Sequence, residues 1–216
     1  MKKSGYMANK YVLPIGLAIV VYLGSLPTVR SQVKLADDPA YTVERILLNG
    51  GSSGGIEITG DCGDTVKAPL TIAGATIEEK LISMQASMPT LRWEKTSLGY
   101  RVKIGTTDVE SVTNVVIPPT TVSIDIDNIQ VATGELLNKP EIENHIARTK
   151  LKLFGPTIGF SSVRTTNAPK QSELKLPRGS MADDLDQIGA ASGQRVWLYA
   201  SNQCDGTLSG RLSWLP

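Results

Sequence analysis

The chain has 216 residues, of which 41% are hydrophobic and 20% are charged, with 22 basic and 21 acidic side chains. This length allows one or two domains of ordinary globular composition. The near balance of charge argues against nucleic acid as a partner, because general affinity for a polyanion needs a concentrated Lys/Arg surface.

The first segment predicts export. Three lysines among the first ten residues precede an apolar run at 11–29, and no acidic residue occurs before Asp37. A basic start followed by an uncharged apolar stretch is typical of a secretory signal peptide, which we expect at 1–31. The run is also about as long as a membrane-spanning helix, so an uncleaved N-terminal anchor is the alternative. Membrane contact is expected only in that case.

An apolar pattern from Tyr41 predicts a short helix that runs into the glycine-rich stretch 50–55. This stretch lacks the Lys-Ser/Thr of a phosphate-binding loop, and it precedes a strand instead of opening a helix. The strand is expected at 55–59, where apolar and polar residues alternate, and a second alternating strand is expected at 69–72.

The clearest helix begins at Thr76, whose hydroxyl forms a capping-box pattern with Glu79. Its apolar residues recur at spacings of four, three and four, which places them on one face, and Pro89 ends it. Two strands joined by a turn are expected next, at 91–93 and 100–104.

The region 105–139 is expected to be a linker that contains an extra strand at its alternating run 122–127. Asp125 and Asp127 project to the same face of that strand. Two adjacent carboxylates can act as acid and base or bind Ca²⁺, but a solvated strand face is the simpler interpretation. Ser123, Asp125 and Asp127 are the candidate contacts if this strand is an open sheet edge.

Pro140 suits a first helical position, and Glu141 and Glu143 would lie at the end of the helix dipole that favours negative charge. We therefore expect a helix at 140–150. It carries His145, the only histidine, so a multi-His metal site is excluded and we interpret this residue as structural. A turn and a strand are expected within 154–162.

A strand at 173–176 leads into a helix that Ser180 caps and Gly193 closes. The last strand pair is expected at 196–199 and 208–215. Three aspartates near the helix start are interpreted as surface charges favoured by the helix dipole: Asp183, Asp184 and Asp186.

The two cysteines of the chain, Cys62 and Cys204, both lie in the part expected to be exported. Outside the cytoplasm two thiols are commonly oxidised, so a disulfide between them is one interpretation. Two unpaired small residues in loops are the other, since the sequence does not place their Cα atoms within bonding range.

Residues 69–95 align without a gap against 173–199 at a constant offset of 104. The four identities include Trp93 with Trp197, which we interpret as shared core residues. Such an alignment predicts two copies of one small unit. We therefore expect an α+β fold of two tandem units, each a short mixed sheet covered by two helices in the order helix-strand-strand-helix-strand-strand.

The stretch Pro69-Leu-Thr-Ile-Ala-Gly-Ala-Thr-Ile-Glu-Glu-Lys-Leu-Ile-Ser-Met resembles the core of the short N-terminal domain of secretins and TonB-dependent receptors. That family has a strand, a Thr/Ser-led helix with acidic residues in its first turn and a central Leu. The resemblance covers the first unit, 40–104, and more loosely the second, 140–216. It implies a periplasmic module that contacts signalling or assembly partners and has no catalytic residues.

These observations favour a non-enzymatic, exported interaction module of the bacterial cell envelope, without a cofactor or metal. The expected partner is an envelope protein or a cell-wall component, bound at a sheet edge or in a groove between the halves. One alternative is an extracytoplasmic carboxylate-dependent hydrolase centred on Asp125 and Asp127. Another is a membrane-tethered subunit of an envelope secretion or signalling assembly.

Overall fold

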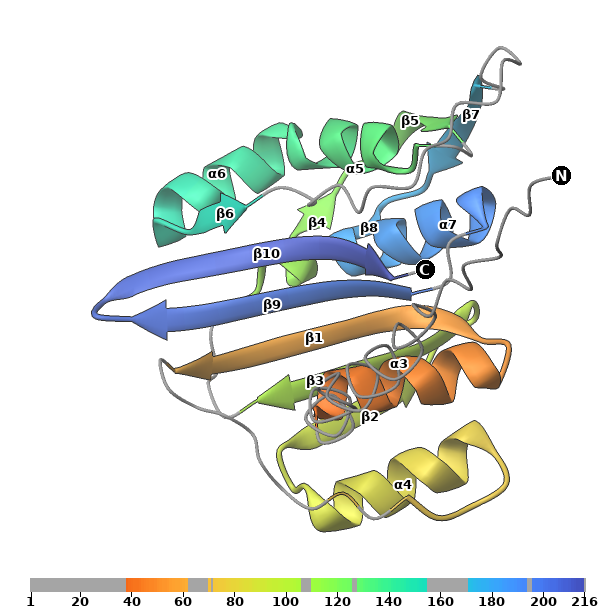
Figure 1. The fold of residues 1–216 in the computed structure, drawn as a ribbon. Helices are drawn as coiled ribbons and strands as arrows, with labels where there is room; N and C mark the ends of the chain where they lie inside the picture. Colours follow the sequence, from red (N-terminus) through yellow and green to blue (C-terminus); the bar gives the residue numbers. More distant parts are fainter. Residues whose placement is uncertain are drawn as a thin grey trace, which may run out of the picture. The chain divides into compact units, whose positions relative to one another are not determined.

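The computed structural model of the protein describes residues 38–61, 70, 72–105, 110–125, 128–154, 171–193 and 196–215. All of them belong to a single unit that spans 36–216. In chain order (Figure 1) the elements are α3 (Pro39–Asn49), β1 (Ser53–Asp61), α4 (Ile77–Ser87), β2 (Leu91–Lys95), β3 (Gly99–Gly105), the 3₁₀ turn η1 (Val112–Asn114), β4 (Val116–Ile117), β5 (Thr120–Asp125), α5 (Gln130–Leu137), α6 (Pro140–Thr149), β6 (Lys152–Phe154), β7 (Gln171–Leu176), β8 (Gly179–Ser180), α7 (Met181–Ser192), β9 (Val196–Cys204) and β10 (Thr207–Leu215).

The α+β class is confirmed. Six strands from both halves of the chain form one mixed sheet in the order β2-β3-β1-β9-β10-β6. The hairpins β2–β3 and β9–β10 are antiparallel, and each has a third strand parallel to its second one, β1 beside β3 and β6 beside β10. The two sets of three strands join through the parallel pair β1–β9. Two further two-stranded sheets, β4–β8 and β5–β7, lie outside this sheet.

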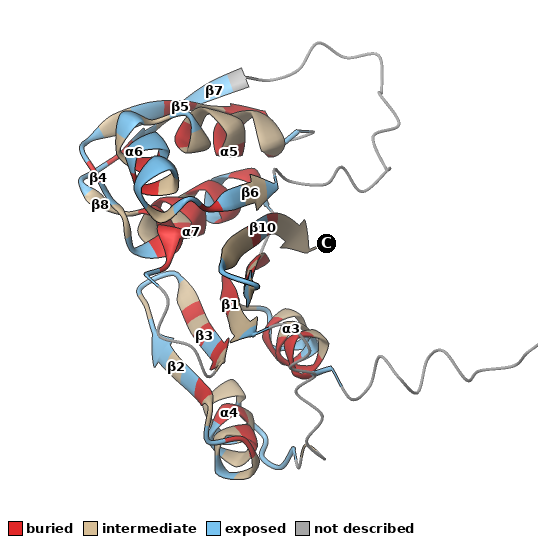
Figure 2. Ribbon diagram, turned by 90° about the vertical axis from the view of Figure 1, so that its left-hand side faces the viewer, coloured by how far each residue is buried: buried red, intermediate tan, exposed pale blue. Residues whose placement is uncertain are grey.

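The two faces of the central sheet belong to two different cores. Ile56 of β1 packs with α3 and α4, in a cluster that includes Leu47 and Leu81. The adjacent residue, Gly55, belongs to the other face of the sheet and lies against the ring of Trp197. Trp197 is part of a second cluster, which includes residues of α5, α6 and α7. Helices α3 and α7 accordingly lie on opposite sides of the sheet (Figure 2).

Local sequence signals explain the helix ends. The Thr76 side chain accepts a hydrogen bond from the Glu79 amide, and the Glu79 carboxylate accepts one from the Thr76 amide, which completes the predicted capping box of α4. Ser180 and Asp183 form the same box at α7, and Gly193 ends that helix in the left-handed region at φ 73°. Each of these predictions is confirmed.

Glycine 55 is required by the close approach of the two halves. A Cβ atom at Gly55 would lie 2.0 Å from a carbon of the Trp197 ring, much closer than any van der Waals contact. The glycine-rich stretch 50–55 therefore lets β1 pass directly beneath a buried tryptophan. It has a structural cause that is independent of phosphate binding.

The region 105–139 was expected to be a linker with one strand, and its described residues hold η1, β4, β5 and α5 and supply part of the second core. Helix α5 was not expected, because its apolar residues surround the helix instead of forming one stripe. The expected strand at 69–72 is wrong at Leu70 and Ile72, which lie outside strands, whereas the matching 173–176 belongs to β7. The two-unit repeat stays a prediction.

None of the described helices is long and apolar enough to cross a membrane. The expected signal peptide or anchor at 1–31 lies outside the described residues.

Candidate functional site

A cleft with a volume of about 390 Å³ lies between α6 and the segment 110–116. Four side chains of α6 line one wall, namely Glu141, Asn144, His145 and Arg148. Their spacing of three, one and three residues puts them on one side of a helix, so α6 presents a polar stripe to the cleft. The opposite wall consists of Glu110, Ser111, Asn114, Val115 and Val116.

An ion pair joins the two walls of this cleft. Arg148 donates hydrogen bonds to both carboxylate oxygens of Glu110, at 3.0 and 2.6 Å. Bidentate geometry of this kind fixes orientation as well as charge. The two opposite charges neutralise each other. Because both side chains are more than half exposed, the ion pair adds little to the stability of the fold.

His145 lies behind this pair and is 3% exposed. Its Nδ1 atom is 3.4 Å from Arg148 Nη2 and 3.8 Å from Glu110 Oε1. Burial lowers the pKa of His145 below its usual 6.5, against the opposing effect of the Glu110 charge. The ring is therefore neutral at pH 7, and its Nε2 atom is buried without a hydrogen bond from any described residue.

This geometry gives His145 no exposed nitrogen with which to accept a proton from a substrate. Its packing agrees with the structural interpretation made from the sequence. Within the described part of the chain, no three His, Cys, Asp or Glu side chains gather in a way that could hold a metal ion.

A second feature is the outer edge of β2. The Thr90 carbonyl accepts a bond from Gly105, and the Thr96 amide donates to Gly99, so the even-numbered positions between them face β3. In an antiparallel pair the alternate residues point the other way. The main-chain groups of Trp93 and Lys95 therefore face outward, and no described strand pairs with that edge.

The predicted edge contacts lie in β5, on a different sheet. The Ser123 amide donates a hydrogen bond to Glu135 Oε2 of α5 at 2.8 Å, so this amide is not available to an incoming strand. Asp125 ends the strand at 9% exposure, and its carbonyl accepts a bond from the Asn128 amide. Asp127 lies outside the described residues.

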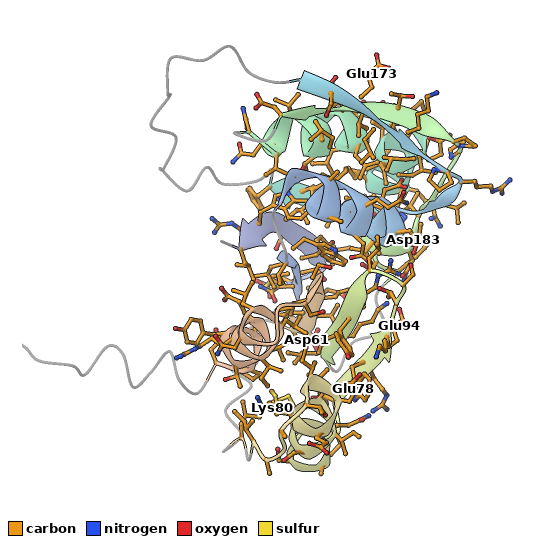
Figure 3. The ribbon with its side chains drawn as sticks, turned by 90° about the vertical axis from the view of Figure 1, so that its right-hand side faces the viewer. Asp61, Glu78, Lys80, Glu94, Glu173 and Asp183 are labelled. Carbon is orange, nitrogen blue, oxygen red and sulfur yellow. The ribbon has the colours of Figure 1, made fainter. Side chains whose placement is uncertain are left out.

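A buried polar network connects the sheet to α7. Arg101 of β3 bonds to Asp186 and to Asp183, whose carboxylate also accepts bonds from Ser180 (Figure 3 labels Asp183 and the nearby Glu94). The Trp197 indole donates to Asp186 Oδ1 at 2.7 Å. Burial raises the pKa of Asp186, and the bonds from Trp197 and Arg101 act against that shift.

Asp184, the next buried carboxylate of α7, has no such partners. It is completely buried, and neither carboxylate oxygen has a hydrogen bond from a described residue. Burial, followed by repulsion from Asp183, raises its pKa to about 7, with Lys139 acting in the opposite direction. The interpretation of Asp184 and Asp186 as surface charges is thus wrong, because α7 packs its acidic first turns against the sheet and α5.

The two predicted core tryptophans differ in burial. Trp197 is 2% exposed, which confirms the interpretation. Trp93 is only partly buried and lies with its ring centre 6.2 Å from that of Tyr100. Cys204 is disulfide-bonded, and Cys62 lies outside the described residues, so the pairing of these two stays a prediction.

Comparison of the chain with protein-family models, curated proteins and solved structures gives no match. The resemblance to the short N-terminal domain of secretins therefore stays a prediction.

Neither the cleft nor the open β2 edge was predicted from the sequence. The recurrence of polar residues at 141, 144, 145 and 148 was a usable signal, since it marks a polar stripe beside the buried Ile142. The segment that completes the cleft is distant in sequence, so only the folded chain shows it. Strand order likewise decides which strand is an edge, and it is not encoded locally.

Proposed function

We propose that the protein is a non-enzymatic, exported interaction module of the bacterial cell envelope that binds an extended segment of a partner protein. The observation that carries this proposal is the open edge of β2. Export is supported by the basic and apolar N-terminal segment, and the envelope by the resemblance to secretin domains.

An open edge binds by adding a strand. The outward N–H and C=O groups of Trp93 and Lys95 would form main-chain hydrogen bonds with the incoming segment. Such bonds supply affinity in strand addition, while side chains on the two faces supply selectivity. The incoming strand must match β2, which is five residues long.

The side chains of β2 favour a charged partner. Arg92, Glu94 and Lys95 are exposed, and their signs alternate along the edge. Charges on an edge strand discourage indiscriminate pairing, because a strand without complementary charges would leave them poorly solvated. Lys95 already pairs with Glu78 at 2.8 Å and Glu94 lies 3.8 Å from Arg101, so an acidic partner residue opposite Arg92 is the charge match expected first.

The contrast with β5 supports a specific use of the β2 edge. At β5 the carboxylate of Glu135 accepts a hydrogen bond from the outward-facing amide of Ser123. The protein therefore blocks this edge with one of its own side chains. Among the described residues no side chain accepts a bond from the Trp93 or Lys95 amide. Leaving one edge open while covering another is the arrangement expected of a docking strand.

The experiment is capture from envelope extract by the purified protein, comparing the wild type with Lys95→Pro and Lys95→Ala. Proline removes the outward N–H without removing a bond to β3, and edge positions tolerate it. Alanine removes the same side chain and its contact with Glu78 but keeps the N–H. We expect one protein band that Lys95→Pro loses and Lys95→Ala keeps.

The captured protein must then bind the purified wild type directly, and a synthetic segment of it must compete. Equal capture by Lys95→Pro and wild type, with both folded by circular dichroism, would reject the β2 edge as the docking site.

A further inference from the structure

The cleft between α6 and 110–116 carries a second inference, which does not depend on the β2 edge. Its volume of about 390 Å³ lies in the range of small-molecule sites. Polar side chains from two distant segments converge on it, and the side chain of Val116, which is 51% exposed, adds an apolar surface. This combination resembles the apolar-plus-polar lining of ligand pockets in general.

Two of the polar side chains have unused hydrogen-bonding capacity. Neither Glu141 nor Asn144 makes a hydrogen bond or ion pair with any described residue, although both face the cleft. Asn114 accepts a long bond of 3.4 Å from Lys103 through its Oδ1 atom, which leaves its NH₂ group to donate. A carboxylate and two amide groups are therefore available to one ligand.

The charge of the cleft selects the sign of that ligand. Glu110 is neutralised by Arg148, and the buried His145 ring is neutral near pH 7. The charge of Glu141 has no counterpart among the residues that line the cleft. The cleft thus has an excess of one negative charge and attracts a cation.

We propose that this cleft binds a small polyhydroxylated amine of the amino-sugar class. Its ammonium group lies against Glu141, its hydroxyl groups bond to the side-chain amides of Asn114 and Asn144, and the C–H face of its ring packs on Val116. A neutral sugar fits the amides equally well but lacks the charge. The cleft therefore distinguishes a free amine from its uncharged relatives.

The test is a titration followed by ¹⁵N NMR, with glucosamine as the probe and glucose and N-acetylglucosamine as the uncharged controls. Glucosamine is expected to shift the side-chain amide signals of Asn114 and Asn144. Its dissociation constant should be lower than that of glucose by about fivefold, the scale of one partly exposed ion pair.

Two single variants of α6 give the matched comparison. Glu141→Gln removes the free carboxylate from the cleft, and Glu143→Gln removes an equivalent exposed charge from the same helical turn outside it. Glu141→Gln should abolish the preference for glucosamine over glucose, and Glu143→Gln should keep it.

Three outcomes would each overturn the proposal: no shift at either asparagine up to tens of millimolar glucosamine, equal affinity for glucosamine and glucose, or equal effects of the two variants. The β2 edge is tested by capture with Lys95 variants, so either site can fail while the other stands.

Discussion

The Nε and Nη2 atoms of Arg101 in β3 both donate hydrogen bonds to Oδ2 of Asp186 in α7, at 2.9 and 2.7 Å. The two residues are 85 positions apart and come from different halves of the chain. Asp186 is 4% exposed, so this contact is an almost buried charge pair that holds α7 on the sheet. Trp197 satisfies the remaining oxygen of the carboxylate.

Arg101→Met should lower the free energy of unfolding by about 3 kcal/mol, because it leaves the Asp186 carboxylate buried without its counter-charge. Urea denaturation measures this loss. In Arg101→Met/Asp186→Asn the combined loss should be smaller than the sum of the single losses, since the second change removes the charge that the first one strands. Lys175→Met, an exposed change on β7, is the control. A loss below about 1 kcal/mol for Arg101→Met contradicts a structural role for the pair.

The buried Asp184 makes stability depend on pH. Its pKa is raised from 3.8 to about 7 in the folded protein, so between these values the folded state holds a proton that the unfolded state releases. The unfolding free energy contributed by this residue therefore falls as pH rises from about 4 to 7, and it levels off above. A three-unit shift corresponds to about 4 kcal/mol at most.

Asp184→Asn removes this penalty. Relative to the wild type, we expect the variant to gain about 2 kcal/mol or more at pH 8 and little at pH 4, measured by urea denaturation at both values. Glu143→Gln on α6 should show no such pH-dependent difference. If the free energies of unfolding of wild type and Asp184→Asn differ by the same amount at pH 4 and pH 8, the Asp184 carboxylate does not titrate between these pH values.

How far the sequence predicts this protein depends on whether a feature is local. The caps at Thr76 and Ser180 and the hairpin strands were predictable, because residues three or two positions apart determine them. The joining of both halves through β1 and β9 was not, since long-range strand pairing leaves no local pattern. Helix α7 shows the same limit, because Asp184 and Asp186 have the spacing of a solvated helix start but are buried.

The Glu135 carboxylate protects the edge of β5. Glu135→Ala should cost about 1–2 kcal/mol, because the Ser123 amide loses a charged acceptor. The exchange rate of the Ser123 amide hydrogen should also rise. Glu173→Ala is the matched control, since Glu173 is the exposed residue opposite Ser123 on β7 (Figure 3). Equal effects of the two changes on the Ser123 amide would contradict this protective contact.

The register of β1 against β9 favours a bond between Cys62 and Cys204. Asp61, the last described residue of β1, lies opposite Gln203, and Cys62 and Cys204 directly follow these two residues in the sequence. Adjacent parallel strands are spaced so that directly opposed Cα atoms lie within disulfide range. Peptide mapping without reductant should recover the linked pair, and Cys204→Ser should lower the unfolding free energy by about 2–4 kcal/mol. Recovery of Cys204 bonded only between two chains would contradict this pairing.

The most direct test of the docking edge is amide hydrogen exchange along β2, with and without the partner captured from the envelope. In the free protein, the outward amides of Trp93 and Lys95 should exchange fast, and those of Arg92 and Glu94, bonded to β3, should be protected. Partner binding by strand addition should protect Trp93 and Lys95 and leave the other two unchanged. Fast exchange of Trp93 and Lys95 in the saturated complex would contradict the account.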